Sequence, residues 1–270
     1  MLVIIRGAGD LASGIALRLW HSGIQVVMTD LAAPLAIRRS VAFCEAIRSG
    51  EVTVEDLTAR FAPTAEDACA LLAQGFLPVL ADPAGACLAR LQPDCVVDAI
   101  LAKRNLGTKI TDAPIVIGIG PGFCAGKDCH AVIESMRGHT LGRAIYRGAA
   151  LPNTNIPGLI GGFAGERVLR APATGVFSAV RKIGDTVKEG DVTGYVAGKP
   201  MCCTIGGTLR GLIADGTPVQ EGLKCGDVDP RGDADYCRLV SDKALAIGGG
   251  VLEALLHLSR KLGQHRTIPA

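Results

Sequence analysis

The stretch Met1-Leu-Val-Ile-Ile-Arg6-Gly7-Ala-Gly9-Asp10-Leu-Ala12-Ser13-Gly14 decides the fold class of the chain. An apolar run with three β-branched residues leads into a glycine turn. Beyond the turn, Leu11, Ile15 and Leu19 recur at helical spacing. This pattern predicts a strand, a tight turn and a helix in direct succession.

The turn has the composition of a nucleotide-binding site. Gly7 can bend the chain at the strand end, Gly9 lets a ligand approach the backbone, and Ala12 stands where a third glycine packs closely. The helix opens at Asp10, so its unpaired N–H groups would face a phosphate. The binding residues expected here are Gly7, Ala8, Gly9, Asp10, Leu11, Ala12 and Ser13.

A second apolar run, residues 24–30, ends in Asp30, twenty-one residues after Gly9. A carboxylate at about this separation can bind the ribose hydroxyls of a nucleotide. Asp10, however, would cap the helix and at the same time repel a phosphate. A purely structural turn is therefore the alternative.

Composition narrows the classes of partner. The 270 residues are 49% hydrophobic and allow two domains, with only 10 aromatic residues to stack on single-stranded nucleic acid. The net charge is +2 without a basic block, which excludes a nucleic-acid or membrane footprint. Apolar runs are too short for a signal segment or a membrane span, so we expect a cytoplasmic protein.

The ten cysteines are expected to be thiols, because no export signal is present and no Cys-x-x-Cys occurs. Residues 34–47 have apolar positions every three or four residues, and Pro34 can start a helix there. Arg38 and Arg39 on this helix would hold a phosphate or a partner carboxylate, or else form a solvated face.

Strands and helices alternate through residues 51–112. Thr64 is the expected cap of one helix, residues 76–80 and 95–100 are expected strands, and residues 84–91 are an expected helix. This alternation is typical of a parallel sheet with crossover connections, whose carboxyl edge binds ligands.

A second glycine-rich stretch, residues 114–130, offers another candidate site. Its strand enters a loop in which backbone N–H groups can form an anion nest. Cys124 is a candidate nucleophile there, because Lys127 or His130 would lower the pKa of its thiol. A tight structural loop is the alternative. The glycines expected to bind the ligand are Gly118, Gly120 and Gly122.

His130 and Glu134 raise the question of a metal. Residues 130–146, however, have the pattern of a β-hairpin, on which side chains four apart lie about 13 Å from each other. That distance is too long for one ion, so no metal site is predicted.

The pattern changes after an irregular stretch at residues 153–162. Residues 166–235 consist of short β-type runs and contain a repeat with an offset of 32, for example Gly184 with Gly216 and Gly190 with Gly222. Two such halves form a small β-sandwich that resembles biotinyl and lipoyl domains. Lys199 lies near the carrier lysine of those domains, but Pro200 follows it directly, so we expect a recognition module.

Ser241 is the expected cap of a last helix over residues 241–262. Glycine costs about 1 kcal/mol per residue in a helix, so Gly248 to Gly250 indicate close packing, most simply onto the first domain. The predicted fold is α/β, with a Rossmann-like nucleotide-binding domain over residues 1–160. A barrel-sandwich hybrid β domain over residues 166–235 and the C-terminal helix complete it.

The combination of several motifs resembles the YqeB family of bacterial accessory proteins. The resemblance covers nearly the whole chain, and its one departure is Asn155, where a glycine is expected. Asn can adopt the same backbone conformation. The motifs are Arg6–Gly14, Ala36–Ser40, Gly118–Phe123, Asp128–Glu134, Arg137–Arg143 and Asp227–Arg231.

The resemblance implies a role in maturing a selenium-dependent molybdenum hydroxylase, which would be the client. The chain would bind molybdopterin dinucleotide or a related nucleotide, or handle labile selenium on Cys124, or less favourably on Cys44 or Cys129. It could form a homo-oligomer. The alternatives are an NAD(P)-dependent oxidoreductase that uses the same turn and Asp30, and a protein-binding chaperone without chemistry.

Overall fold

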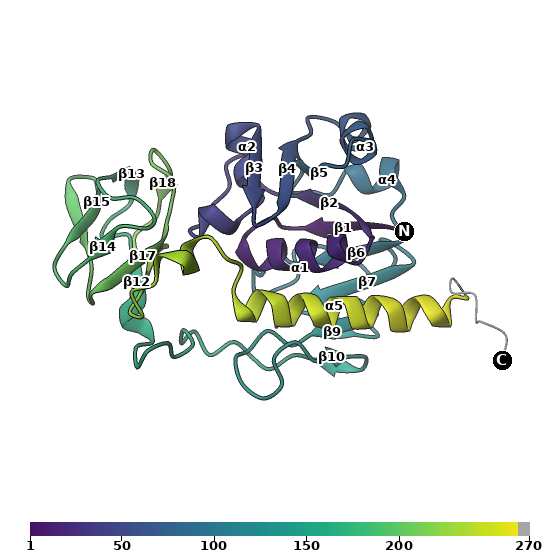
Figure 1. The fold of residues 1–270 in the computed structure, drawn as a ribbon. Coiled ribbons are helices and arrows are strands. Elements are labelled where there is room, and N and C mark those ends of the chain that lie inside the picture. The colour runs from purple at the N-terminus through teal and green to yellow at the C-terminus, as the bar shows by residue number, and fades with distance from the viewer. Residues whose placement is uncertain (264–270) are drawn as a thin grey trace.

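The computed structural model describes residues 1–263, and its largest part is a nine-stranded, mostly parallel sheet (Figure 1). The strand order is β10-β9-β7-β6-β1-β2-β5-β4-β3. All neighbours from β9 to β4 pair in parallel, and only the two edge strands are antiparallel. The strands are β1 (Leu2–Arg6), β2 (Gln25–Thr29), β3 (Glu51–Val54), β4 (Leu57–Phe61), β5 (Leu77–Leu80), β6 (Cys95–Asp98), β7 (Ile115–Ile119), β9 (Ala131–Ile133) and β10 (Ala144–Ile145).

The chain reverses its direction of winding around the central strand β1. It passes from β1 to β2 and β5 on one side, and then returns to β6 and β7 on the other. In open parallel sheets such a reversal leaves a crevice at the carboxyl ends of the strands, where ligands bind. Here the crevice lies between the ends of β1 and β6.

Helices cover both faces of the sheet, and this explains why β1 is apolar from Leu2 to Ile5. Val3 and Ile5 pack toward α1 and α5, whereas Ile4 packs toward α3 and α4. Thr64 caps α3 with a complete capping box, as predicted. The helices are α1 (Asp10–His21), α2 (Glu45–Ser49), α3 (Ala65–Ala73), α4 (Cys87–Leu91) and α5 (Asp242–Lys261), and the 3₁₀ turns are η1 (Arg39–Val41), η2 (Gly165–Arg167) and η3 (Ala234–Cys237).

The long C-terminal helix α5 packs on α1, which confirms the expected return to the sheet domain (Figure 1). The contact depends on glycine: a Cβ on Gly14 would lie 2.5 Å from the Cβ of Ala244, and one on Gly248 would lie 2.9 Å from the Gly14 carbonyl oxygen. Ser241 caps α5 by accepting the Ala244 N–H at 3.1 Å. Thus α5, the last helix within residues 1–263, covers α1, the first helix.

Residues 168–229 form two four-stranded antiparallel sheets with an internal twofold repeat and one shared hydrophobic core, and this unit is called the sandwich below. The Gly184 N–H donates to the Leu209 carbonyl, and at the offset of 32 the Gly216 N–H donates to the Phe177 carbonyl. Lys199 follows a two-residue turn as the first residue of β16. The strands are β12 (Val168–Arg170), β13 (Gly175–Ala179), β14 (Thr186–Val187), β15 (Val192–Val196), β16 (Lys199–Cys202), β17 (Gly207–Leu212), β18 (Pro218–Val219) and β19 (Lys224–Asp229).

Two local predictions were wrong, and two are confirmed. Residues 34–47 do not form one helix, because the Ile37 carbonyl accepts the Leu212 N–H at 2.7 Å and draws the chain toward β17. Residues 51–61 form the β3–β4 hairpin, which the sequence pattern missed. The β9–β10 hairpin is present as expected, and Asn155 does adopt a left-handed backbone with φ 59°.

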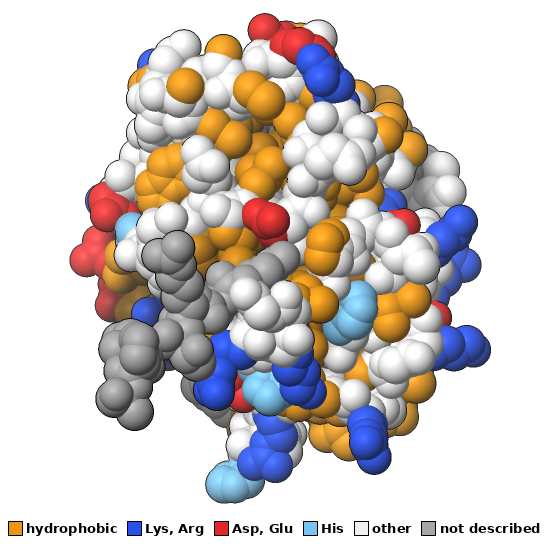
Figure 2. All heavy atoms as spheres, turned by 90° about the vertical axis from the view of Figure 1, so that its right-hand side faces the viewer, with side chains coloured by type: hydrophobic (Ala, Val, Ile, Leu, Met, Phe, Trp, Pro, Cys, Tyr) orange, Lys and Arg blue, Asp and Glu red, His pale blue; other side chains and the backbone are white. Residues whose placement is uncertain are grey.

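Figure 2 shows one face of the molecule, on which hydrophobic side chains gather in the upper half and most Lys and Arg side chains lie toward the lower and right-hand margins. None of the helices within residues 1–263 combines the length and the hydropathy needed to cross a membrane.

Candidate ligand-binding site

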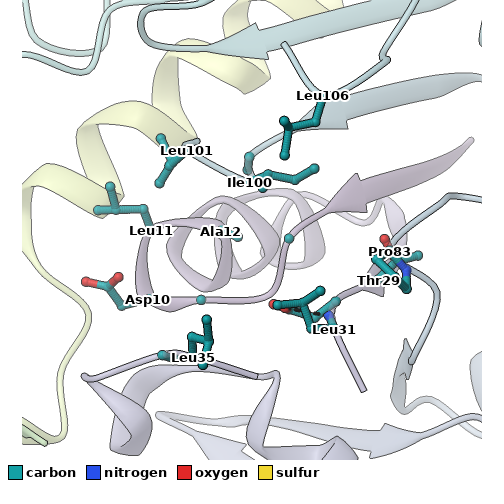
Figure 3. Close-up of a pocket in the computed structure, with 15 residues that line it drawn as sticks. Asp10, Leu11, Ala12, Thr29, Leu31, Leu35, Pro83, Ile100, Leu101 and Leu106 are labelled. Carbon is teal, nitrogen blue, oxygen red and sulfur yellow. Dashed lines mark hydrogen bonds between the residues drawn. The ribbon is translucent and has the colours of Figure 1, made fainter. Parts of the chain in front are cut away.

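A cleft of about 410 Å³ opens at the crevice between β1 and β6. The loops after β1, β2 and β6 form its walls, and the N-terminal end of α1 reaches into it (Figure 3). Aliphatic side chains surround that helix end, namely Leu31, Leu35, Ile100, Leu101 and Leu106. The cleft therefore offers an apolar enclosure with one polar end.

The two glycines of the first turn, Gly7 and Gly9, have different structural roles. Gly7 has φ +99°, and a Cβ there would lie 2.7 Å from the Ala99 carbonyl oxygen, so the fold itself needs this glycine. Gly9 has φ −72° and ψ −178°, which any residue can adopt, and a Cβ there would meet nothing within 4 Å. Gly9 lines the cleft. Packing within the fold therefore does not require glycine at position 9, and the missing side chain leaves space in the cleft.

Asp30 holds the turn in place from the end of β2. Its Oδ2 accepts the Ala8 N–H at 2.7 Å, and its Oδ1 accepts the Leu31 N–H at 2.7 Å. Burial raises the pKa of this carboxyl above its ordinary value, and the two N–H groups oppose that effect. The Ala8 N–H is therefore not free to bind a ligand. Each Asp30 oxygen can still accept a second hydrogen bond, and Asp30 lines the cleft.

The structure brings six of the predicted binding residues of this motif to the wall of the cleft. They are Gly7, Gly9, Asp10, Leu11, Ala12 and Asp30. The other two lie behind it: Ala8 is fully buried, and the buried Ser13 hydroxyl accepts the Phe43 N–H at 2.9 Å.

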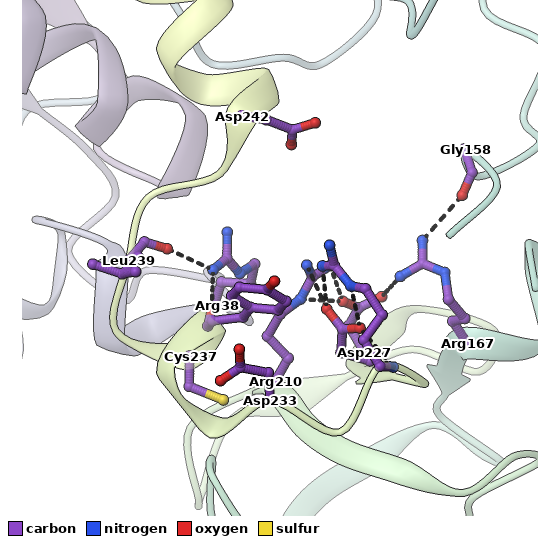
Figure 4. A network of polar contacts seen from close by, with 12 residues as sticks. Arg38, Gly158, Arg167, Arg210, Asp227, Asp233, Cys237, Leu239 and Asp242 are labelled. Atoms are coloured by element: carbon purple, nitrogen blue, oxygen red, sulfur yellow. Dashed lines mark hydrogen bonds and ion pairs between the residues drawn. The ribbon is translucent and has the colours of Figure 1, made fainter. Parts of the chain in front are cut away.

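Arg38 and Arg39 do not line the cleft. Arg38 is 6% exposed, and its Nη2 donates to the carbonyls of Tyr236 and Leu239 at 2.9 and 3.1 Å (Figure 4). Its Nη1 lies 3.6 Å from Oδ2 of Asp10, so it compensates the carboxylate that would repel a phosphate. Arg39 donates from Nε to the Leu212 carbonyl at 2.9 Å. These arginines join the sheet domain to the β-sandwich.

A buried ion-pair network lies on the sandwich side of this junction (Figure 4). Asp227 on β19 is paired with Arg167 at 3.0 Å and with Arg210 at 2.5 Å, and the fully buried Asp229 lies 3.1 Å from Arg210. The sequence pattern had predicted no role for these residues. The sequence signal for this network was a pair of acidic residues, Asp227 and Asp229, two positions apart on a strand. Such residues can be buried on one face of a strand only if cationic side chains pair with them.

The second glycine stretch is built differently from the expected anion nest. Gly118 lies within β7, and the Gly120 N–H donates to the Ile133 carbonyl at 2.8 Å. A Cβ on Gly122 would lie 2.7 Å from the backbone of Arg104. These glycines therefore serve close packing and strand ends, and none of the three lines the cleft at β1.

Cys124 opens the short strand β8 (Cys124–Ala125), which pairs with β11 (Gly148–Ala149). Its N–H donates to Oδ2 of Asp128 at 2.8 Å, while Lys127 is exposed. Burial lowers the pKa of His130, whose Nδ1 accepts the Val116 N–H at 3.0 Å, so this ring is not the expected cation. Neither Cys124 nor Lys127 lines the cleft at β1, and their catalytic roles stay predictions.

A second pocket of about 440 Å³ lies beside the first, on the far side of the loop that follows β6. It is lined by Lys103, Arg137 and Lys243, and by Pro121 from the second glycine stretch. No sequence pattern predicts this pocket, because its cations come from three separate segments.

Fold and site together define an α/β protein with a cleft at the crevice of a mostly parallel sheet and two appended antiparallel sheets. The chain is 54% identical over 257 residues to YqeB of Escherichia coli (strain K12), an uncharacterized protein. The match covers 95% of this chain and 48% of YqeB, so the chain spans about half the length of that relative. No family model matches the chain.

Two solved structures show a remote similarity. One is an aspartoacylase family protein of Mesorhizobium loti, with 14% identity, coverage of 84% of both chains and a TM-score of 0.28. The other is a succinylglutamate desuccinylase/aspartoacylase of Rhodobacter sphaeroides, with 14% identity, coverage of 86% of both chains and a TM-score of 0.26.

Proposed function

We propose that the chain binds a nucleotide-containing ligand in the cleft between β1 and β6. The proposal includes the finer fold assignment, a Rossmann-like unit over residues 1–160 joined to a biotinyl-like sandwich over residues 166–235. The observation that carries it is Gly9, a cleft residue whose lack of a side chain nothing in the fold requires. Asp30 would accept the ribose hydroxyls, and the end of α1 would receive the phosphates.

The proposed biological role is maturation of a molybdenum hydroxylase, with molybdopterin dinucleotide as the ligand and the hydroxylase as the client. This step depends on the family resemblance, and the sandwich would be the surface that docks the client. The similarity to YqeB supports the resemblance without adding an activity.

Binding is favoured over hydride transfer by the residues of the cleft. Among the described residues that line it, none is His, Tyr, Lys or Cys, and the only acidic ones are Asp10 and Asp30. A dehydrogenase needs a proton donor or acceptor beside the nicotinamide. The cleft instead has an apolar lining and hydrogen-bond acceptors, which suit binding of a ligand rather than proton transfer.

Native mass spectrometry and calorimetric titration with NAD, CTP and molybdopterin cytosine dinucleotide test the proposal. The Gly9→Ala variant should bind the best ligand at least about tenfold more weakly, because its Cβ occupies the ligand's place, and Gly9→Val should lose more. Both should stay folded with a Tm no more than about 4 °C below the parent, because the backbone at Gly9 is ordinary but Ala and Val cap α1 less well than glycine.

Gly165→Ala is the matched control, because a Cβ at Gly165 also meets nothing within 4 Å and this residue is not among those that line the cleft. It should bind like the parent. Unchanged affinity in Gly9→Val, or no nucleotide adduct with any of the three ligands, would refute a nucleotide site at this turn.

The same mass spectra, recorded with selenide and thiol, test the selenium role. Cys124 is half-buried, whereas Cys44 and Cys129 are fully buried, and burial raises the pKa of both of their thiols. A gain of selenium mass that is lost in Cys124→Ser would support a carrier role for this thiol. An unchanged gain in Cys124→Ser would exclude that role.

A further inference from the structure

The second pocket is walled by the loop after β6, by the turn after β9 and by the segment that leads to the sandwich. Its cationic residues are Lys103, Arg137 and Lys243, and no carboxylate is among the described residues that line it. The loop after β6 separates it from the nucleotide cleft, since Leu101 lines the cleft and Lys103 lines the pocket.

The backbone positions Lys103 at some energetic cost. Leu101 has φ 61° and Lys103 has φ 62°, so two residues that carry side chains adopt the left-handed conformation with only Ala102 between them. Such conformations are unfavourable for residues that carry a side chain, and they cluster at ligand sites. The alternation directs neighbouring residues of one short loop to two different pockets.

A buried carboxylate builds the opposite wall. Glu134 is 2% exposed, and its two oxygens accept the N–H groups of Met136 at 2.7 Å and of Leu151 at 2.8 Å. Met136 and Leu151 both line the pocket. The wall is therefore held by charge-assisted hydrogen bonds rather than left as a loose loop.

The residues that line the pocket carry an excess of about two positive charges, and the buried carboxylate of Glu134 in its wall reduces this excess. Arg137 is paired with Asp242 through two hydrogen bonds of 2.7 and 2.8 Å, whereas Lys103 and Lys243 have no carboxylate within 4 Å among residues 1–263. Burial and the nearby Arg137 lower the pKa of Lys243, so an anion would relieve an unfavourable charge.

Two further features indicate what kind of anion fits. Ser135 lines the pocket and is 9% exposed, and its hydroxyl makes no hydrogen bond within residues 1–263. Leu151 and Ile156, also lining residues, expose 48% and 72% of their surface. An anionic head would satisfy the lysines and the hydroxyl, and an apolar body would cover the exposed side chains.

We propose that this pocket binds a phosphomonoester of a small organic molecule, independently of the nucleotide cleft. A phosphomonoester carries a charge of about −1.5 to −2 at pH 7, which matches the two uncompensated lysines. Its three terminal oxygens would be bound by Lys103, Lys243 and the Ser135 hydroxyl, and its organic part would lie against Leu151 and Ile156.

Calorimetric titration of the full chain with phenyl phosphate tests this proposal. Lys103→Gln and Lys243→Gln should each weaken binding by about tenfold or more, because each removes one charge-assisted contact. Lys188→Gln, which changes an exposed lysine of the sandwich, should bind like the parent. Phenylacetate, a monoanion of similar shape, should bind at least about tenfold more weakly than phenyl phosphate.

Gly9→Val separates this proposal from the nucleotide site, because it should leave phenyl phosphate binding unchanged. Three results would overturn the proposal: no binding of phenyl phosphate in the millimolar range, equal losses in Lys188→Gln and Lys243→Gln, or a loss in Gly9→Val with none in the two pocket lysines. Circular dichroism of each variant confirms that a loss of binding is not a loss of folding.

Discussion

At the scale of single residues, the Arg137–Asp242 pair makes the stability of the chain depend on pH. Hydrogen bonds from Arg137 hold the pKa of Asp242 at about 2, below its usual 3.8. The folded state therefore favours the charged carboxylate, and the stabilisation is complete above about pH 4 and lost as the pH falls toward 2. Because Asp242 is 72% exposed, screening by solvent limits the gain to about 0.5 kcal/mol.

Asp242→Asn should accordingly lower the free energy of unfolding by about 0.5 kcal/mol at pH 7, and the difference from the parent should shrink as the pH falls from 4 to 2. Urea unfolding of both proteins across this range measures it. Added salt at pH 7 should also reduce the difference. A difference that grows on acidification would contradict the assignment.

Single residues also show how far the sequence predicts the site. Gly7, Gly9 and Asp30 were predicted from spacing alone, because a strand, a turn and a second strand place them by local rules. Arg38 was predicted to hold a phosphate but does not line the cleft; it lies in the domain junction, because Tyr236 and Leu239, about 200 positions away, bind its guanidinium. No local pattern encodes such contacts.

At the scale of elements, the glycines of α5 record which face of the helix is packed. A Cβ on Gly248 would lie 2.8 Å from Cγ of Arg18, and one on Gly250 would lie 2.9 Å from Cγ2 of Ile133 and closer still to the Gly142 carbonyl. A Cβ on Gly249 would meet nothing within 4 Å. Adjacent glycines in one helix thus have opposite structural roles.

Gly249→Ala should stabilise the chain by up to about 1 kcal/mol, because alanine is the better helix former and the site is open. Gly250→Ala should destabilise it by about 1–3 kcal/mol, because the backbone of Gly142 cannot move aside without disturbing the β9–β10 hairpin. Urea unfolding of the two variants gives the comparison. Equal effects of both substitutions would show that α5 does not pack closely on this hairpin.

Elements are also where sequence prediction succeeds and fails most clearly. The α5 helix, its Ser241 cap and its glycine contacts follow from periodicity and helix propensity, which are local. Residues 34–47 have a helical period too, but the backbone of Ile37 bonds to β17 instead. Tertiary hydrogen bonds override a weak local preference there, and only the three-dimensional structure reveals the competing strand.

At the scale of the whole molecule, Arg38 links the cleft between β1 and β6 to the sandwich. Its guanidinium is held by carbonyls of the segment after β19 and lies 3.6 Å from Asp10, which lines the cleft. A shift of the sandwich that moved Tyr236 and Leu239 would thus change the charge beside Asp10. If the cleft binds a nucleotide as proposed, we expect such a shift to change its affinity.

A double-mutant cycle tests this link on the nucleotide that binds best among NAD, CTP and molybdopterin cytosine dinucleotide. Arg38→Met should weaken binding by about tenfold, because Asp10 is left uncompensated beside the phosphates, although Arg38 itself does not line the cleft. Asp10→Asn should strengthen binding a few-fold by removing the repelling charge. Adding Arg38→Met to Asp10→Asn should then cost less than about threefold, because the charge that Arg38 compensates is gone.

Arg38→Lys is the conservative control: it keeps a cation near Asp10 and should retain most of the affinity while losing the bonds to the carbonyls. Calorimetry gives each dissociation constant, and circular dichroism verifies the fold of every variant. If Arg38→Met costs the same with Asp10 and with Asn at that position, the arginine acts only through packing, and the sandwich has no electrostatic route to the cleft. The cycle therefore decides whether the two parts of this chain work as one binding unit.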